Sequence, residues 1–304
     1  MHKNQITIEL ITQLLEEQFP QWADLPIRPV EKDGWDNLTM RLGDSLSVRF
    51  PSADMYTPQV EKEHRWLPLL RPQLPFPIPI PLGRGVPSDR FPRPWSVYHW
   101  LPGQQATPQR VSDPVRMAED VSGFLNALRR IDATSGPRAG LHSFHRGDSP
   151  AHWDDSARTA ITALADLIDT SAALAIWDTA LNSAWNAPPV WFHGDMSGGN
   201  LLVRDGGLSA VIDFGTCGVG DPACDLVIAW SFFRGAGRDA FRRGVALDED
   251  TWARARGWML WKAAITLQDA REEAPDRIEQ AGVQFGWRTG ALELIEDVLS
   301  DVDC

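Results

Sequence analysis

The stretch Val190-Trp-Phe-His-Gly-Asp-Met-Ser-Gly-Gly-Asn-Leu-Leu-Val-Arg-Asp-Gly-Gly-Leu-Ser-Ala-Val-Ile-Asp-Phe-Gly215 is the most informative part of this sequence. Two short apolar runs flank Asp205-Gly206-Gly207, and this pattern predicts a β-hairpin. With the turn centred on the two glycines, Asn200 is expected directly opposite Asp213, where cross-strand Cβ atoms lie about 5 Å apart. An amide oxygen and a carboxylate at this spacing suit a Mg²⁺ ion that is bound together with a substrate phosphate.

A third polar group precedes this pair. Asp195 lies five residues before Asn200, in a glycine-bearing loop that follows a short predicted strand at 190–193. This position would leave its carboxylate exposed beside the metal. A base or orienting acceptor next to two metal ligands is what phosphoryl transfer requires.

Outward from this stretch, the sequence pattern differs between the two parts of the chain. Before Pro102, apolar periodicity predicts a helix at 6–19 with Thr7 as its cap, strands at 27–30, 38–42, 46–50 and 95–101, and a helix at 59–70. After Pro102, it predicts helices at 114–131, 153–168, 172–185, 222–233, 250–271 and 276–299, with short strands at 190–193, 201–204 and 209–212. The expected fold is therefore α+β, with a β-rich N-terminal lobe (1–100), a hinge near 99–103 and a mainly helical C-terminal lobe (101–304).

Composition supports a globular chain of this size. The 304 residues are 43% hydrophobic and include 14 Trp and 12 Phe, enough for a large core. Trp252, Trp258 and Trp261 recur at roughly helical spacing, which favours core positions over an aromatic cage for a substrate.

Charge and cysteine content limit the partners and the compartment. The net charge is −12, and most of the excess acid lies after residue 100. This balance disfavours nucleic-acid binding, and it suits either a cationic substrate or simple solubility. Three cysteines without a CxxC pair indicate a reducing compartment. No signal peptide or membrane-spanning run is recognised, so a cytoplasmic protein without a membrane partner is expected.

The central stretch resembles the catalytic core of the aminoglycoside phosphotransferase family, within the protein-kinase-like superfamily. His193-Gly194-Asp195, then Asn200, then Ile212-Asp213-Phe214-Gly215 match that family's spacing. Further on, Gly220-Asp221-Pro222-Ala223-Cys224-Asp225-Leu226 is similar to the start of a family helix. The resemblance extends from about residue 27 to 270 and implies a protein-kinase-like fold with two lobes.

The resemblance also implies roles for these residues. Asp195 would orient a substrate hydroxyl and accept its proton, and His193 would brace the catalytic loop. Asn200 and Asp213 would hold Mg²⁺ against the phosphates of ATP or GTP. Asp225 would support the loop by hydrogen bonds, cap the helix that follows, or do both.

The N-terminal lobe carries the implied nucleotide residues. The segment 60–67 resembles the family helix that carries an ion-pairing glutamate. Glu63 is the first candidate for this glutamate, and Glu61, on another face of the same helix, is the alternative. Arg49 stands where the family has a lysine for the nucleotide phosphates, and its planar guanidinium is wider than an ammonium. Ser197 occupies the position of the phosphate-binding lysine of protein kinases. The nucleobase would meet backbone groups of His99, Trp100 and Leu101.

These observations predict a kinase that transfers the nucleotide γ-phosphoryl group to a hydroxyl of an aminoglycoside-type acceptor. A macrolide, sugar, choline or amino-acid alcohol is the alternative acceptor. Two other kinds of protein stay open: a catalytically silent nucleotide-binding regulator, suggested by Arg49, and a metal-dependent hydrolase that uses Asp195 and Asp213. The hydrolase lacks the histidine ligand sets usual for such sites.

Overall fold

The computed structural model describes residues 2–31, 33–34, 36–273 and 275–301. By its internal contacts the chain divides into two compact units, Met1–Pro102 and Gly103–Cys304. Within the described residues, no helix combines the length and the apolar character needed to cross a membrane.

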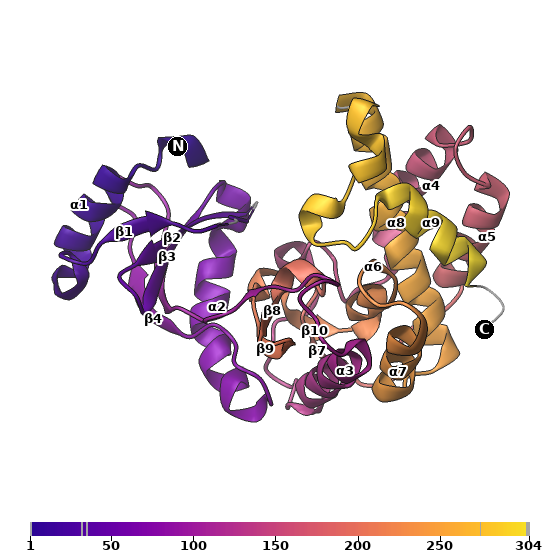
Figure 1. Cartoon of the computed structure of the whole chain (residues 1–304), viewed down its shortest axis with the longest axis horizontal. Coiled ribbons are helices and arrows are strands. Elements are labelled where there is room, and N and C mark those ends of the chain that lie inside the picture. The colour runs from indigo at the N-terminus through magenta and orange to yellow at the C-terminus, as the bar shows by residue number, and fades with distance from the viewer. Residues whose placement is uncertain (1, 32, 35, 274, 302–304) are drawn as a thin grey trace. The chain divides into compact units, whose positions relative to one another are not determined.

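The first unit is built on a five-stranded antiparallel sheet with the strand order β1-β2-β3-β5-β4 (Figure 1). Its strands are β1 (Ile27–Pro29), β2 (Asn37–Leu42), β3 (Leu46–Pro51), β4 (Pro81–Gly85) and β5 (Trp95–His99). Leu42 pairs with Leu46, which confirms the predicted hairpin between β2 and β3. Gly43 makes this tight turn possible because it adopts φ +58, a conformation that glycine enters without strain.

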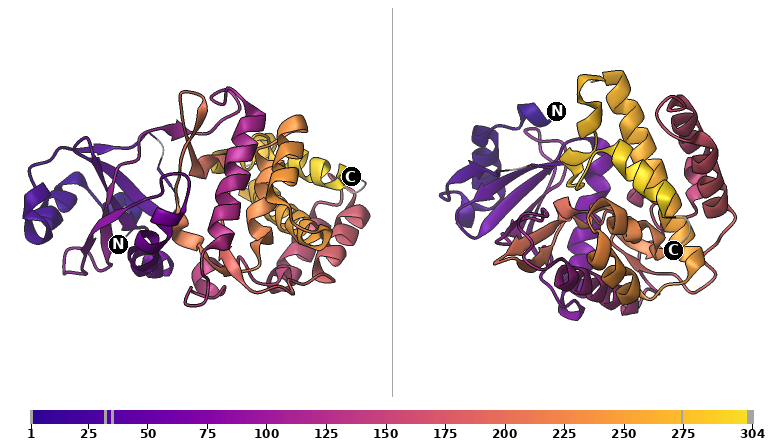
Figure 2. Two further views of the ribbon diagram at one scale, coloured as in Figure 1. Left: turned by 90° about the horizontal axis from the view of Figure 1, so that it is seen from below. Right: turned by 45° about the vertical axis from the view of Figure 1, so that its right-hand side comes forward.

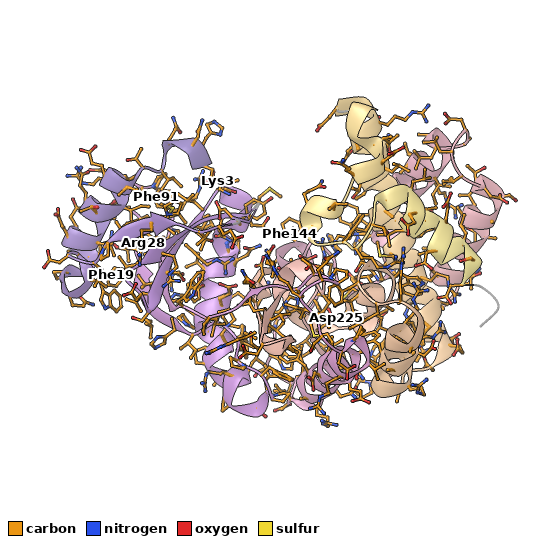
Figure 3. The ribbon with its side chains drawn as sticks, viewed as in Figure 1. Lys3, Phe19, Arg28, Phe91, Phe144 and Asp225 are labelled. Atoms are coloured by element: carbon orange, nitrogen blue, oxygen red, sulfur yellow. The ribbon has the colours of Figure 1, made fainter. Side chains whose placement is uncertain are left out.

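Aromatic and aliphatic side chains form the core of the first unit. Helix α1 (Ile8–Gln18) begins at Thr7, whose hydroxyl accepts a hydrogen bond from the Leu10 N–H (3.2 Å). Phe50 of β3 stacks on Trp95 of β5 with ring centroids 4.9 Å apart, and Phe91, which is labelled in Figure 3, packs edge-on against Phe50. Helix α2 (Thr57–Leu70) presents Glu63 as a buried residue. The core thus fixes β3 and α2, which carry the predicted nucleotide residues.

The second unit contains two small sheets. Its strands are β6 (Gln104–Gln105), β7 (Val190–Phe192), β8 (Leu201–Arg204), β9 (Gly207–Val211) and β10 (Gly218–Gly220). Strands β6, β8 and β9 form one antiparallel sheet, and β7 pairs with β10 to form the other. The catalytic loop predicted from the sequence runs from the end of β7 to the start of β8, so each sheet holds one end of it.

Seven α-helices are described in the second unit. They are α3 (Pro114–Arg130), α4 (Asp154–Ala163), α5 (Thr170–Leu181), α6 (Ile228–Ser231), α7 (Gly235–Val245), α8 (Glu249–Glu273) and α9 (Ala291–Ser300). Helix α3 packs along α7, while the long α8 packs against α4, α5 and α9 (Figure 2). Helix α3 begins as predicted, with the Asp113 carboxylate accepting hydrogen bonds from two N–H groups of its first turn.

Two helical predictions for this unit were wrong. The segment expected as one helix at 276–299 consists of two short 3₁₀ segments followed by α9, because Gly282 and Gly286 adopt φ +93 and +78 and interrupt the helix. The helix expected at 222–233 is mostly the 3₁₀ segment η9 (Pro222–Val227), which the short α6 continues. Helix α7 was not predicted at all, although Ala240, Phe241 and Val245 lie buried along one of its faces.

Candidate active site

A buried carboxylate fixes the loop that follows β7. Asp225 of η9 is 2% exposed and accepts hydrogen bonds from the N–H groups of His193 (2.8 Å) and Gly194 (2.6 Å). Burial raises the pKa of Asp225, against the opposing effects of His193 and the two N–H groups. The cap of η9 is Asp221, whose side chain accepts from the Ala223 N–H (3.0 Å). Of the two roles left open by the sequence, the structure therefore assigns loop support to Asp225.

The first two residues of this loop, His193 and Gly194, have little conformational freedom. Gly194 adopts φ +89, and a Cβ at this position would lie 2.8 Å from the Thr216 carbonyl oxygen. The His193 ring is fully buried, accepts from the Asp195 N–H at Nδ1 (3.2 Å) and contacts the Ile212 carbonyl through Nε2 (3.0 Å). With Nδ1 as the acceptor of one hydrogen bond, Nε2 is the ring nitrogen that can donate to the Ile212 carbonyl. His193 thus connects the loop to the end of β9 and positions Asp195.

The Asp195 carboxylate lies between two nitrogen donors. Asn200 Nδ2 donates to its Oδ2 (2.9 Å) and to its backbone carbonyl (2.8 Å), and Lys262 Nζ contacts Oδ1 (2.8 Å). The Asp195 side chain is 31% exposed. Burial acts to raise the pKa of this carboxyl, but Lys262 and then Arg146 oppose it and hold the pKa below its ordinary value. Asp195 is therefore ionised at neutral pH, as a proton acceptor must be.

Lys262 was not predicted as a site residue. It belongs to α8, where Arg254, Trp258 and Lys262 follow one another at intervals of four and so lie on one face. Trp258 is 3% exposed, so this face points into the protein interior and carries a cation with it. A lysine in register with a core tryptophan is the sequence signal that identifies such a residue, because a half-buried ammonium is stabilised by an anionic partner.

The predicted pairing of Asn200 with Asp213 is wrong by one residue. The Ile212 N–H donates to the Asn200 carbonyl (2.9 Å), so Ile212 is the residue opposite Asn200. The hairpin turn falls on Asp205-Gly206, which adopt φ +53 and +82, rather than on the two glycines. This is the geometry of a two-residue hairpin turn with positive φ at both positions. Between the pairs Leu202–Ala210 and Val203–Leu208 the register shifts again, with Ser209 of β9 as the extra residue of a bulge.

Asn200 and Asp213 still suit a divalent cation. Both side-chain hydrogen bonds of Asn200 within the described residues use its amide nitrogen, so the amide oxygen is available as a ligand. Asp213, just beyond Ile212, adopts φ +68, a conformation uncommon outside glycine. Strained backbone of this kind often occurs at functional sites. An amide oxygen and a carboxylate are hard oxygen ligands, as Mg²⁺ prefers.

In the first unit, Arg49 and Glu63 lie together. Arg49 Nη1 is 3.5 Å from Glu63 Oε1, while Glu63 Oε2 accepts a hydrogen bond from the Tyr98 hydroxyl. The Glu63 side chain is 4% exposed, and Arg49 also lies over the Tyr98 ring. Glu61 is largely exposed and pairs only loosely with Arg84 (4.0 Å). Of the two glutamates, the buried one therefore partners Arg49, and it holds the guanidinium on the sheet surface.

The residues predicted to meet the nucleobase lie at and after the end of β5. The His99 N–H donates to the Ile80 carbonyl (3.0 Å), and the Trp100 N–H donates to the Ser45 carbonyl (2.8 Å). Two of the backbone donors in His99–Leu101 are thus used inside the first unit. A base contact from this segment would have to use its carbonyls or the Leu101 N–H.

Comparison with known proteins agrees with this architecture. A model of the phosphotransferase enzyme family matches residues 26–258. No curated protein sequence matches the chain.

Several solved structures share the fold. A GDP and kanamycin complex of APH(2")-IIia has a TM-score of 0.68 at 20% identity and covers 96% of this chain and 99% of that one. A gentamicin complex of APH(2")-IIa has a TM-score of 0.64 at 20% identity, with 95% and 98% covered. The macrolide 2'-phosphotransferase MphH from Brachybacterium faecium has a TM-score of 0.58 at 21% identity, with 91% and 98% covered.

The family match extends over well more than half of the chain, and the structural matches confirm the predicted fold: an N-terminal antiparallel sheet followed by a largely helical part. This chain accordingly belongs to the phosphotransferase enzyme family and is a kinase-like phosphotransferase.

Proposed function

We propose that this phosphotransferase moves the γ-phosphoryl group of ATP or GTP to a hydroxyl group of a small molecule, with Asp195 as proton acceptor. The observation that carries the proposal is the fixed position of Asp195. Its carboxylate is ionised, held by Asn200 on one oxygen and by Lys262 on the other, on a loop that Asp225 anchors. A preorganised base of this kind orients a hydroxyl for attack and takes its proton as the new bond forms.

Asn200 and Asp213 are the proposed ligands of Mg²⁺. When bound, this ion neutralises charge on the nucleotide phosphates. The Asn200 side chain would then have two functions, because its nitrogen orients Asp195 while its oxygen faces the ion. His193 acts only by positioning, through its contacts with Asp195 and Ile212.

We assign nucleotide binding to the first unit and catalysis with acceptor binding to the second. Arg49 would contact nucleotide phosphates, and Glu63 would keep its guanidinium in place. The nucleobase would contact the backbone of His99, Trp100 and Leu101, as the sequence predicts.

The aminoglycoside-type acceptor is the first candidate. Two of the structural relatives are described as complexes with kanamycin and gentamicin, and the acidic excess after residue 100 suits a polycation. A macrolide is the second candidate, because another relative is a macrolide 2'-phosphotransferase. Both are alcohols, so either fits the chemistry proposed for Asp195.

Product analysis tests the proposed activity. The full chain is incubated with Mg²⁺ and ATP or GTP in the presence of aminoglycosides, macrolides and simpler alcohols, and products are analysed by mass spectrometry. A gain of one phosphoryl group on an acceptor, lost when Mg²⁺ is chelated, is the expected result. Nucleotide binding without any phosphorylated product across the panel would favour the silent regulator instead.

Arg49 provides a separate test of nucleotide binding. Arg49→Ala removes a charged donor to the phosphates, so KM for the Mg²⁺-nucleotide should rise about 10-fold or more while KM for the acceptor stays constant. Arg49→Lys keeps the charge and should recover part of the loss. Initial-rate kinetics with each substrate varied in turn measure both constants. An unchanged nucleotide KM in Arg49→Ala would remove Arg49 from the phosphate site.

A further inference from the structure

We propose that the acceptor pocket beside Asp195 takes an alcohol that carries an anionic group, such as a hydroxycarboxylate, and that Arg146 binds this anion. The inference rests on the proposed function, because it names the substrate class of the same site. It differs from the aminoglycoside prediction, which rests on the family resemblance and on the charge of the whole C-terminal part.

The pocket lies entirely within the second unit. Its lining includes Arg146, Asp195, Val227, Trp258, Trp261 and Lys262. One anionic side chain and two cationic side chains therefore face a small space with apolar walls. Since Lys262 and Asp195 form an ion pair (2.8 Å), their charges compensate each other, and the remaining charge is that of Arg146.

Arg146 has no acidic partner of its own. Among the residues that the structure describes, no carboxylate lies within ion-pair distance of its guanidinium, although the side chain is half-buried. Its guanidinium lies near the Phe144 ring, whose centroid is 5.8 Å from Cζ (Phe144 is labelled in Figure 3), and it acts on Asp195 only at longer range, beyond the Lys262 ion pair. A half-buried guanidinium is costly unless an anion compensates it, so a ligand carboxylate would supply what the chain does not.

The backbone holds Arg146 firmly in place. Its N–H donates to the Ser143 carbonyl (3.0 Å), and the Ser143 hydroxyl donates to its carbonyl (2.9 Å). Gly147 adopts φ +80 and packs so closely on Phe192 of β7 that a Cβ would lie 1.9 Å from the ring. A cation on such a fixed segment is preorganised for a ligand rather than free to move into solvent.

Trp258 and Trp261 contribute aromatic surface to the pocket lining. Trp258 is 3% exposed, and its indole N–H is buried without a hydrogen-bond partner in the described part of the chain. Trp261, in contrast, donates to the Ser156 hydroxyl (3.2 Å). The charged side chains of the lining are thus two cations and one anion, which favours a negatively charged ligand and disfavours an ammonium next to Lys262.

Matched acceptors on the full chain test this inference. The aromatic series consists of phenyllactate, phenyllactamide and the amino alcohol in which an aminomethyl group replaces the carboxylate. The same three forms of hydroxyisocaproate provide an aliphatic series. Binding is measured by thermal shift and calorimetry with Mg²⁺-nucleotide present, and transfer by mass spectrometry. Kanamycin is included as the polycationic acceptor.

We expect the carboxylates to bind best, and Arg146→Gln to weaken their binding about 10- to 100-fold with little effect on the amides. Arg146→Lys should restore part of the affinity because it keeps the charge. Arg138→Gln is the matched control, since it removes an exposed arginine from the preceding segment. Melting of each variant without ligand shows whether it folds.

The outcomes separate the two proposals. Preferred binding of kanamycin or the amino alcohols, or carboxylate binding that Arg146→Gln leaves unchanged, overturns the anionic acceptor even if phosphoryl transfer occurs. The absence of any carboxylate-induced stabilisation in either series overturns it as well. Carboxylate binding that depends on Arg146 without phosphoryl transfer to any compound would support the pocket and argue against the proposed activity.

Discussion

Asp195→Asn is expected to lower kcat for phosphoryl transfer by about 10²- to 10⁴-fold, the usual contribution of a positioned general base. Asparagine has nearly the same shape, and its side-chain oxygen can still accept the hydrogen bond from Asn200 Nδ2. The substitution therefore removes the proton acceptor while it leaves the loop in place. Steady-state rates with any acceptor found in the panel measure the effect, and KM for the nucleotide should change little.

Lys262→Met tests whether the charge next to Asp195 matters. Lys262 is the largest of the groups that lower the Asp195 pKa against the effect of burial, so its removal should raise that pKa. The acidic limb of the pH profile of kcat/KM should then move to higher pH, while in the wild type it lies below the ordinary range of an aspartate. If the acidic limb does not move in Lys262→Met, a group other than Asp195 controls that limb. Equal rates for Asp195→Asn and the wild type would exclude Asp195 as the base.

Sequence and structure agree best where a residue's function depends on local spacing. The loop from His193 to Asn200 could be located because Gly194, Asp195 and Asn200 occur in this order, at fixed spacing, between two short predicted strands. For Asp225 the sequence left loop support and helix capping open, and only its hydrogen bonds to the N–H groups of His193 and Gly194 decide between them. The hairpin register was wrong because Asp-Gly and Gly-Gly both suit a two-residue turn, and only the packing of β8 on β6 and β9 selects between them.

Other features of the site depend on contacts between distant segments. Lys262 lies 67 positions after Asp195, and no local pattern brings the two together. Arg146 belongs to an irregular segment without apolar periodicity, so its place in the pocket depends on the packing of Gly147 against β7. Total charge and pocket charge are also separate properties: the first is read from the composition, whereas the second depends on the few side chains that line the pocket.

The second large effect is expected in stability. Arg254 is 2% exposed, and its Nε lies 2.6 Å from Oδ2 of Asp221, which caps η9 four residues before Asp225. Arg254→Met would leave a buried carboxylate without its counter-ion, so the free energy of unfolding should fall by about 3–5 kcal/mol. Chemical denaturation followed by circular dichroism measures this loss. Exposed Arg204→Met on the β8–β9 hairpin is the matched control and should change stability little.

The double variant Arg254→Met/Asp221→Asn separates the buried charge from lost packing. Removing both charges should recover a large part of the stability, because the penalty of the single variant comes from the unpaired carboxylate. Burial raises the pKa of Asp221 even beside Arg254, and loss of the guanidinium should raise this pKa further. In the single variant, the native state therefore binds more protons than the unfolded state. Its stability deficit should therefore shrink as the pH falls toward the ordinary aspartate range. A deficit that is independent of pH and that persists in the double variant would instead assign the effect to the contacts of Arg254 with Ser183 and Thr251.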